Sequence, residues 1–136
     1  MRIRHPLALV AVVLALPAVA LAVDARRDAI LAGYAAKART AAFSAQRGEV
    51  LFRTKWAGGD ARTASCTACH TDNPRQPGRN AKTGRSIEPV AVSINPGRFT
   101  DAATVEKQFA RDCRSVLGRE CTPLEKGDYI TFMAGQ

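Results

Sequence analysis

The 136-residue sequence has few aromatic residues, no internal repeat and no alternation of apolar and polar residues at the period of a strand. Aromatic residues make up 6% of the chain, and the 20 basic residues are interleaved with 12 acidic ones. Nucleic-acid binding requires clustered basic residues with aromatic stacking platforms, so the sequence argues against that class. The net charge of +8 is typical of a solvated basic surface or of a docking face for an acidic redox partner. The missing strand pattern predicts an all-α fold.

The sequence also lacks an apolar run of the roughly 20 residues that a membrane-spanning helix needs. Two arginines near the N-terminus precede an apolar segment at 7–21, which Pro17 interrupts. Ala20-Leu21-Ala22 offers small residues at the positions that a signal peptidase reads. We therefore predict that residues 1–22 are a signal peptide, cleaved before Val23, and that the mature protein is periplasmic.

Helical periodicity predicts four helices in the remaining chain. They are expected at 28–38, at 44 to about 55 with Gly58-Gly59 as its end, from about 101 to 118, and from 122 onward. Ser44 is a suitable cap for the second helix, and Thr100 or Asp101 for the third. Gly118 is placed to end the third helix. The segment Thr122-Pro123-Leu124-Glu125 is a capping box with proline at the first helical position, which fixes the start of the last helix.

The segment Cys66-Thr67-Ala68-Cys69-His70 has the C-x-x-C-H spacing of covalent haem attachment. One helical turn places both thiols on one side, where they add to the haem vinyl groups, and His70 points at the iron. A thioredoxin-type dithiol and half of a zinc site share C-x-x-C. However, His70 is the only histidine after the predicted cleavage, no strand pattern surrounds the motif, and the other two cysteines are too widely spaced for paired zinc ligands. We predict one haem c on Cys66 and Cys69, with His70 as the proximal ligand.

The segment at 71–96 is rich in proline, glycine, asparagine and arginine and has no sustained periodicity. Structureless segments of this length are uncommon in small domains, so this segment must wrap around something. A haem supplies that missing core. We therefore expect a signal peptide at 1–22, an N-terminal helical extension at 23–43 and a cytochrome c domain at 44–136.

Cys113 and Cys121 are the remaining cysteines, and in an exported protein a disulfide is the default interpretation. On one continuous helix their Cα atoms would lie about 12 Å apart, which is too far for a disulfide. Gly118 ends the helix between them and so allows the bend. We predict a structural disulfide that stabilises the fold by about 2–3 kcal/mol. The alternative is a redox-active thiol pair near the haem.

The sixth iron ligand decides whether a haem protein carries electrons or binds small gases. Met133 is the only methionine after Met1, and its place in the last helix indicates a core residue. Asp112 shares a helical stripe with the apolar residues of the third helix and should face inward. An inward carboxylate needs a buried ion pair, a cap to a neighbouring loop, or a role at the iron or in the distal pocket. Asn95 is a rival donor, although a turn residue before Pro96 is the plainer interpretation.

From about Gly33 to the C-terminus the chain resembles the sphaeroides haem protein (SHP) family of oxygen-binding c-type cytochromes, which are DUF1924-like. The segments that carry the resemblance are Cys66 to His70, Asn95-Pro96-Gly97-Arg98-Phe99-Thr100-Asp101, Val105-Glu106-Lys107 and Gly118-Arg119-Glu120-Cys121-Thr122. The resemblance implies a small class I-like cytochrome c fold, a disulfide matching Cys113 with Cys121, and an asparagine as sixth ligand directly before the first disulfide cysteine. Here that position is Asp112, a possible distal ligand. A carboxylate is a harder, anionic donor, which should favour ferric over ferrous iron.

Together these features predict a periplasmic monohaem cytochrome that accepts electrons and binds a diatomic ligand, O2 or NO, at a labile or open sixth position. A haem-based redox activity toward oxygen or NO would follow, with Asp112 as the candidate catalytic residue. The alternative is a plain electron-transfer cytochrome c whose iron stays six-coordinate. The expected partner is another cytochrome, possibly dihaem, that meets a ring of lysines at 55, 82, 107 and 126. No coiled-coil seam is present, so we expect a monomer.

Overall fold

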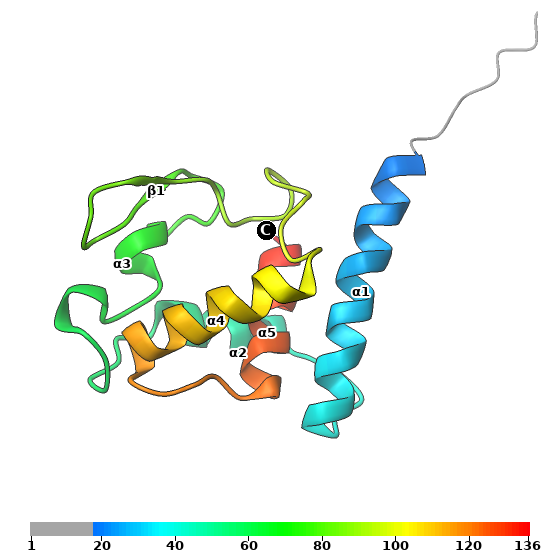
Figure 1. Cartoon of the computed structure of the whole chain (residues 1–136), viewed down its shortest axis with the longest axis horizontal. Coiled ribbons are helices and arrows are strands. Elements are labelled where there is room, and N and C mark those ends of the chain that lie inside the picture. Colours follow the sequence, from blue (N-terminus) through cyan, green and yellow to red (C-terminus); the bar gives the residue numbers. More distant parts are fainter. Residues whose placement is uncertain (1–17) are drawn as a thin grey trace, which may run out of the picture.

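The computed structural model describes residues 18–136, which form five α-helices, one 3-10 turn and one very short β-hairpin (Figure 1). The elements are α1 (Ala18–Ala38), α2 (Ala45–Arg53), η1 (Ala61–Thr63), α3 (Thr67–His70), β1 (Gly78–Arg79), β2 (Ser86–Ile87), α4 (Ala102–Leu117) and α5 (Pro123–Ala134). The all-α prediction is confirmed, because each strand contains only two residues. Most of the predicted signal peptide falls at residues 1–17, outside the described part of the chain. Within 18–136, no helix is long and apolar enough to cross a membrane.

The crossing of α2 and α5 forms the centre of the fold. Gly48 allows the two helices to touch, because a Cβ at this position would lie 2.6 Å from the backbone carbon of Asp128 and 2.8 Å from Cβ of Phe132. Phe52 is fully buried one turn further along α2, with its ring 5.8 Å from that of Phe132 and 6.3 Å from that of Tyr129. Gly48 and Phe52 thus pack α2 directly against α5.

Local capping fixes both ends of α4 and the start of α5. The Asp101 carboxylate accepts from the backbone N–H of Thr104 at 2.7 Å, and Gly118 ends α4 with a left-handed φ of 74°. The Thr122 side chain accepts from the Glu125 N–H, and the Glu125 carboxylate accepts from the Thr122 N–H, so the predicted capping box is present. These three boundaries follow directly from the sequence because each depends only on residues within about one helical turn.

Helix α1 runs along one side of the molecule and contacts α5 (Figure 1). Arg27 is buried, with 5% of its surface exposed, and donates to the carbonyl oxygens of Pro96 at 2.7 Å and Arg98 at 3.3 Å. Tyr34 donates a 2.7 Å hydrogen bond to Glu106 on α4, and burial is the main cause that raises the pKa of this phenol. Helix α1 is thereby attached both to the loop before α4 and to α4 itself. The division into an extension at 23–43 and a domain at 44–136 stays a prediction.

Two helix boundaries predicted from the sequence are wrong, and one segment expected to be irregular contains a short hairpin. Helix α1 begins at Ala18 rather than at residue 28, since its earlier residues also favour a helix. Helix α2 ends at Arg53, where Thr54 turns to extended backbone and its hydroxyl donates to Val50, so Gly58-Gly59 do not end it. The segment at 71–96 contains the β1–β2 hairpin, whose two-residue strands are too short to give a periodic signal.

Candidate functional site

The C-x-x-C-H motif lies on one short turn of helix. Cys66 caps α3, and its carbonyl oxygen accepts from the N–H groups of Cys69 at 3.2 Å and His70 at 3.0 Å. This turn brings both cysteines and His70 to the wall of the same cavity. Thr71 follows with a φ of 60°, an uncommon conformation for a β-branched residue, and the chain leaves the helix abruptly there. The local geometry is that expected for two thiols and an imidazole directed at one group.

The β1–β2 hairpin packs against the backbone of α3. Gly78 in β1 lies so close to the backbone that an added Cβ would be 3.1 Å from the carbonyl carbon of Cys69 and from the Cα of His70. Ala81, in the turn between the strands, directs its N–H at the Cys69 sulfur from 3.4 Å. The segment predicted to wrap around the haem therefore contacts the attachment turn itself.

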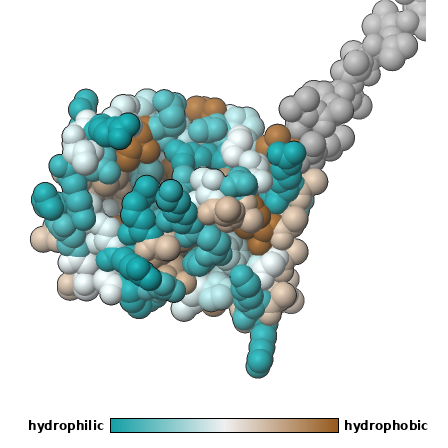
Figure 2. All heavy atoms as spheres, in the orientation of Figure 1, coloured by the Kyte–Doolittle hydropathy of each residue, from teal (hydrophilic) through white to brown (hydrophobic). Residues whose placement is uncertain are grey.

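A cavity of about 770 Å³ opens beside this turn, between α3, α4 and the loop before α4. Its wall is mainly apolar, through Leu51, Ile87, Val90, Phe99, Val105, Phe109, Val116, Leu117 and the ring of Tyr129. The face drawn in Figure 2 carries many hydrophilic side chains with smaller hydrophobic areas between them. A large apolar cavity with two thiols and one imidazole on one wall fits the shape and chemistry of haem c.

The two alternative uses of C-x-x-C do not fit the cavity. Burial, with a contribution from the Asp112 charge, raises the pKa of Cys66 to about 12, whereas a dithiol redox site requires a lowered thiol pKa. Among residues 18–136, no group of three or more histidine, cysteine, aspartate or glutamate side chains is placed to hold a metal ion, so a zinc cluster is not formed.

Burial lowers the pKa of His70, so its imidazole is neutral near pH 7. The Asp112 charge opposes this shift, while the charges of Arg98 and Arg111 add to it. A neutral imidazole is the form that ligates a metal. The same buried wall raises the pKa of Tyr129, which therefore keeps its proton.

The structure places Asp112 on the cavity wall, as the helical stripe predicts. It is not in a buried ion pair: 49% of its side chain is exposed, and its partner is the adjacent Arg111. Arg111 donates to one carboxylate oxygen from Nε at 2.6 Å and to the other from a terminal nitrogen at 3.0 Å. Sequence reasoning missed Arg111, although the Arg-Asp dipeptide at this position is a visible signal.

The other two candidate distal ligands, Met133 and Asn95, lie outside the cavity wall. Met133 is fully buried in the core and is not part of the cavity wall, which agrees with the sequence interpretation. Asn95 is likewise absent from the wall, and its carbonyl oxygen accepts from the Arg98 N–H within a turn. Among the described cavity-wall residues, Asp112 is the predicted candidate that the structure brings to the haem-binding side of α4.

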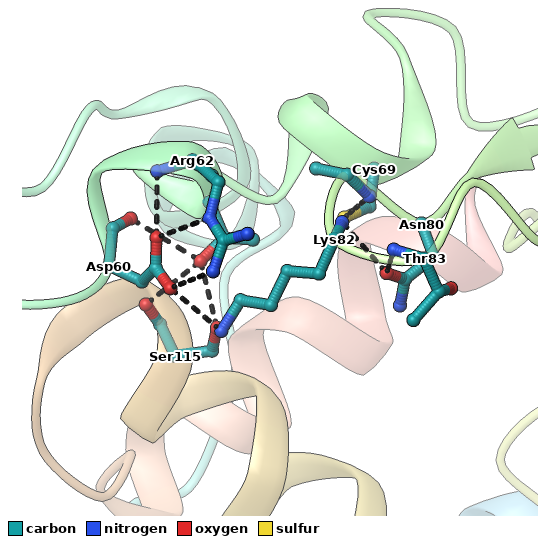
Figure 3. A network of polar contacts seen from close by, with 9 residues as sticks. Asp60, Arg62, Cys69, Asn80, Lys82, Thr83 and Ser115 are labelled. Carbon is teal, nitrogen blue, oxygen red and sulfur yellow. Dashed lines mark hydrogen bonds and ion pairs between the residues drawn. The ribbon is translucent and has the colours of Figure 1, made fainter.

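A polar network closes one edge of the cavity (Figure 3). The Asp60 carboxylate lies 3.0 Å from Nζ of Lys82 and accepts from the Arg62 N–H, while the Asp60 N–H donates to the carbonyl oxygen of Ser115 on α4. Donation from Arg62 and Lys82 lowers the pKa of Asp60. This network joins η1, the hairpin turn and α4, and sequence reasoning missed it because its members are far apart in the chain. Of the four lysines expected around the haem, only Lys82 reaches the cavity wall.

Cys113 and Cys121 form a disulfide with their Cα atoms 5.6 Å apart, across the bend at Gly118. Both cysteines also contribute to the cavity wall. The bridge therefore joins the end of α4, which carries Asp112, to the segment that leads into α5.

Residues 38–133 match the family described as Domain of unknown function (DUF1924). The chain belongs to this family. A relative of this DUF1924 chain, the Cytochrome c-type protein SHP of Cereibacter sphaeroides, is 45% identical over 117 residues, which cover 86% of this chain and 89% of that protein. Cytochrome c'' of Methylophilus methylotrophus is 38% identical over 86 residues, covering 63% and 60% of the two chains. The resemblance to the SHP family is thus confirmed.

Solved structures agree with this assignment. The structure of oxidized SHP, described as an oxygen binding cytochrome c, superposes with a TM-score of 0.77 at 44% identity and covers 81% of this chain and 96% of that chain. The crystal structure of oxidized cytochrome c'' from Methylophilus methylotrophus gives a TM-score of 0.64 at 28% identity, covering 86% and 96%. The DUF1924 chain is therefore a c-type cytochrome, a class of protein that holds haem covalently.

Proposed function

We propose that this cytochrome is a periplasmic monohaem protein that accepts electrons and binds O2 or NO at a labile or open sixth position of its iron. One observation carries the proposal: the cavity that holds Cys66, Cys69 and His70 has the carboxylate of Asp112 on its wall, whereas Met133 is buried away from it. A strong, permanent methionine ligand is thus unavailable from this position. The oxygen-binding description of SHP, a relative at 45% identity, supports the same choice.

When bound, haem c would supply an iron that changes between the ferric and ferrous states. Cys66 and Cys69 would hold the group covalently, and neutral His70 would serve as the proximal ligand. Asp112 offers an anionic, hard oxygen donor, which would favour ferric over ferrous iron. The hold of this carboxylate would therefore be weaker in the reduced protein and would leave room for a small neutral molecule.

The test is spectroscopic. The purified ferric protein is examined by visible and electron paramagnetic resonance spectroscopy, then reduced without oxygen and exposed to carbon monoxide. High-spin ferrous haem that binds carbon monoxide supports the proposal. Low-spin ferrous haem that does not bind carbon monoxide would overturn the proposal. It would identify a plain electron-transfer cytochrome with a permanent sixth ligand. Asp112→Ala tests the distal role, because unchanged ferric spectra and ligand binding in this variant would remove it.

The electron donor in this proposal is another cytochrome, possibly dihaem, with an acidic surface. Its expected docking site is the cavity rim, which carries Lys82, Arg85, Arg111 and Arg114. Lys82, Arg111 and Arg114 are each paired with a carboxylate, so Arg85 is the one of these four rim cations that has no ion-pair partner among the described residues. Reduction by an acidic cytochrome should slow as ionic strength rises, because screening shortens the range of the attraction. A rate that is independent of salt would exclude electrostatic docking at this rim.

A further inference from the structure

The Arg111–Asp112 pair on the cavity wall is built differently from the other exposed ion pairs of α4. The two residues are neighbours in sequence, and the guanidinium donates one hydrogen bond to each oxygen of the carboxylate, at 2.6 and 3.0 Å. Such a two-point contact fixes the orientation of a carboxylate as well as its position. The charges of both residues act on His70, so the pair lies within electrostatic range of the proximal ligand.

Arg114 offers a natural comparison one turn along the same helix. It also contributes to the cavity wall, but its guanidinium lies 2.6 Å from the carboxylate of Glu120, in the connection to α5, and does not contact Asp112. The exposed fractions of the two arginine side chains are similar, 70% for Arg111 and 67% for Arg114. Arg111 therefore forms an ion pair with Asp112, whereas Arg114, which is similarly exposed on the same wall, pairs with Glu120 instead.

A guanidinium that occupies both carboxylate oxygens draws electron density away from them. The carboxylate keeps free lone pairs, so it still has a site for a metal, but its donor strength is reduced and its orientation is set by Arg111. Building on the distal role given to Asp112 above, we propose that Arg111 is a positioning residue that restrains this carboxylate, weakens its bond to ferric iron and so keeps the distal position exchangeable.

The experiment measures the affinity of the ferric, haem-loaded protein for imidazole at pH 8 by visible spectral titration. Imidazole is mainly neutral at this pH, so its affinity does not simply report the net charge of the cavity. Releasing the carboxylate in Arg111→Gln should strengthen its competition with imidazole and lower the affinity about two- to fivefold, the size expected for an exposed charge pair. Arg111→Lys, which keeps the charge and loses the two-point contact, should fall between the wild type and Arg111→Gln.

Arg114→Gln is the control, because it removes one cation from the same wall without touching Asp112. It should leave the affinity for imidazole unchanged. In an Asp112→Ala background, Arg111→Gln should also have no effect, since its target carboxylate is gone. Equal effects of the two arginine variants, or an Arg111→Gln effect that persists beside Asp112→Ala, would overturn the proposal. A raised affinity in Arg111→Gln would do the same, because Arg111 would then be supporting the carboxylate at the iron.

The same set of variants separates this inference from the proposed function. If Asp112→Ala alone changes neither the ferric spectrum nor the affinity for imidazole, the distal role of Asp112 fails and the role of Arg111 fails with it. If Asp112→Ala changes both and Arg111→Gln changes neither, only the role of Arg111 fails.

Discussion

The contact at Gly48 gives the sharpest prediction about what holds the haem cavity in place. In Gly48→Ala the added methyl group would meet the backbone carbon of Asp128 at 2.6 Å and Cβ of Phe132 at 2.8 Å, and neither is the flexible end of a side chain. The helices must therefore move apart. Overpacking of this kind costs about 1–3 kcal/mol, and steric contact with backbone places the cost at the upper part of that range.

The intrinsic gain from replacing glycine by alanine inside a helix, about 1 kcal/mol, opposes this cost. The net expectation for Gly48→Ala is a loss of about 1–2 kcal/mol in the free energy of unfolding. For a chain of this size the midpoint of thermal unfolding should then fall by about 3–8 °C.

Gly33→Ala in α1 is the matched control, because nothing lies within 4 Å of the position that its Cβ would occupy. The same substitution should here stabilise the protein by up to about 1 kcal/mol. The assay is urea unfolding of the haem-loaded protein, followed by circular dichroism, with equal slopes required before midpoints are compared. Opposite signs for the two variants support the reasoning. A Gly48→Ala protein as stable as the wild type would refute it, since the close approach of α2 and α5 would then carry no energetic weight.

Three further predictions concern polar groups and the disulfide. Asp128→Ala should lower the free energy of unfolding by about 1–3 kcal/mol, because it removes the buried acceptor of the Ser44 N–H, which lies 2.7 Å away; an unchanged urea midpoint would contradict this. Donation from Arg119 lowers the pKa of Glu125 from its usual 4.5, so its contribution to stability is full above about pH 4.5 and is lost as the pH falls through the lowered pKa. Urea midpoints of Glu125→Gln should therefore depend less steeply on pH in the acid range than those of the wild type, and parallel profiles would exclude this source of acid lability. Replacing both disulfide cysteines with serine should cost about 2–3 kcal/mol in urea unfolding, and a smaller loss would mean that the bend at Gly118 persists without the crosslink.

The parts of the fold that could be predicted from sequence are those that depend on neighbouring residues. The capping box at Thr122, the cap at Asp101 and the left-handed end at Gly118 each rest on contacts within about one helical turn. The attachment turn at 66–70 is equally local, because the motif and its helical geometry are contained in five residues. Such signals survive tertiary packing, since packing adds to them and does not compete with them.

The end of α2 shows why other boundaries were out of reach. Thr54 leaves the helix before Gly58 and Gly59, which the sequence marks as the stop, and the backbone N–H of Trp56 then donates to the carbonyl oxygen of Ala64. The two glycines then serve another purpose: their missing side chains let the loop lie against the backbone of the last turn of α4. This close approach to α4 cannot be predicted from the helix propensities of the residues around Gly58 and Gly59.

The same distinction applies within the site. Periodicity correctly directs Asp112 toward the cavity, because a helix fixes the direction of every side chain along it. Periodicity does not tell what the carboxylate meets there, and the expected buried partner is replaced by the adjacent, exposed Arg111. The direction of a residue is thus a property of its helix, whereas its chemistry depends on which charges share the wall. Helical periodicity therefore places Asp112 on the cavity wall, whereas its ion pair with Arg111 is established by the structure.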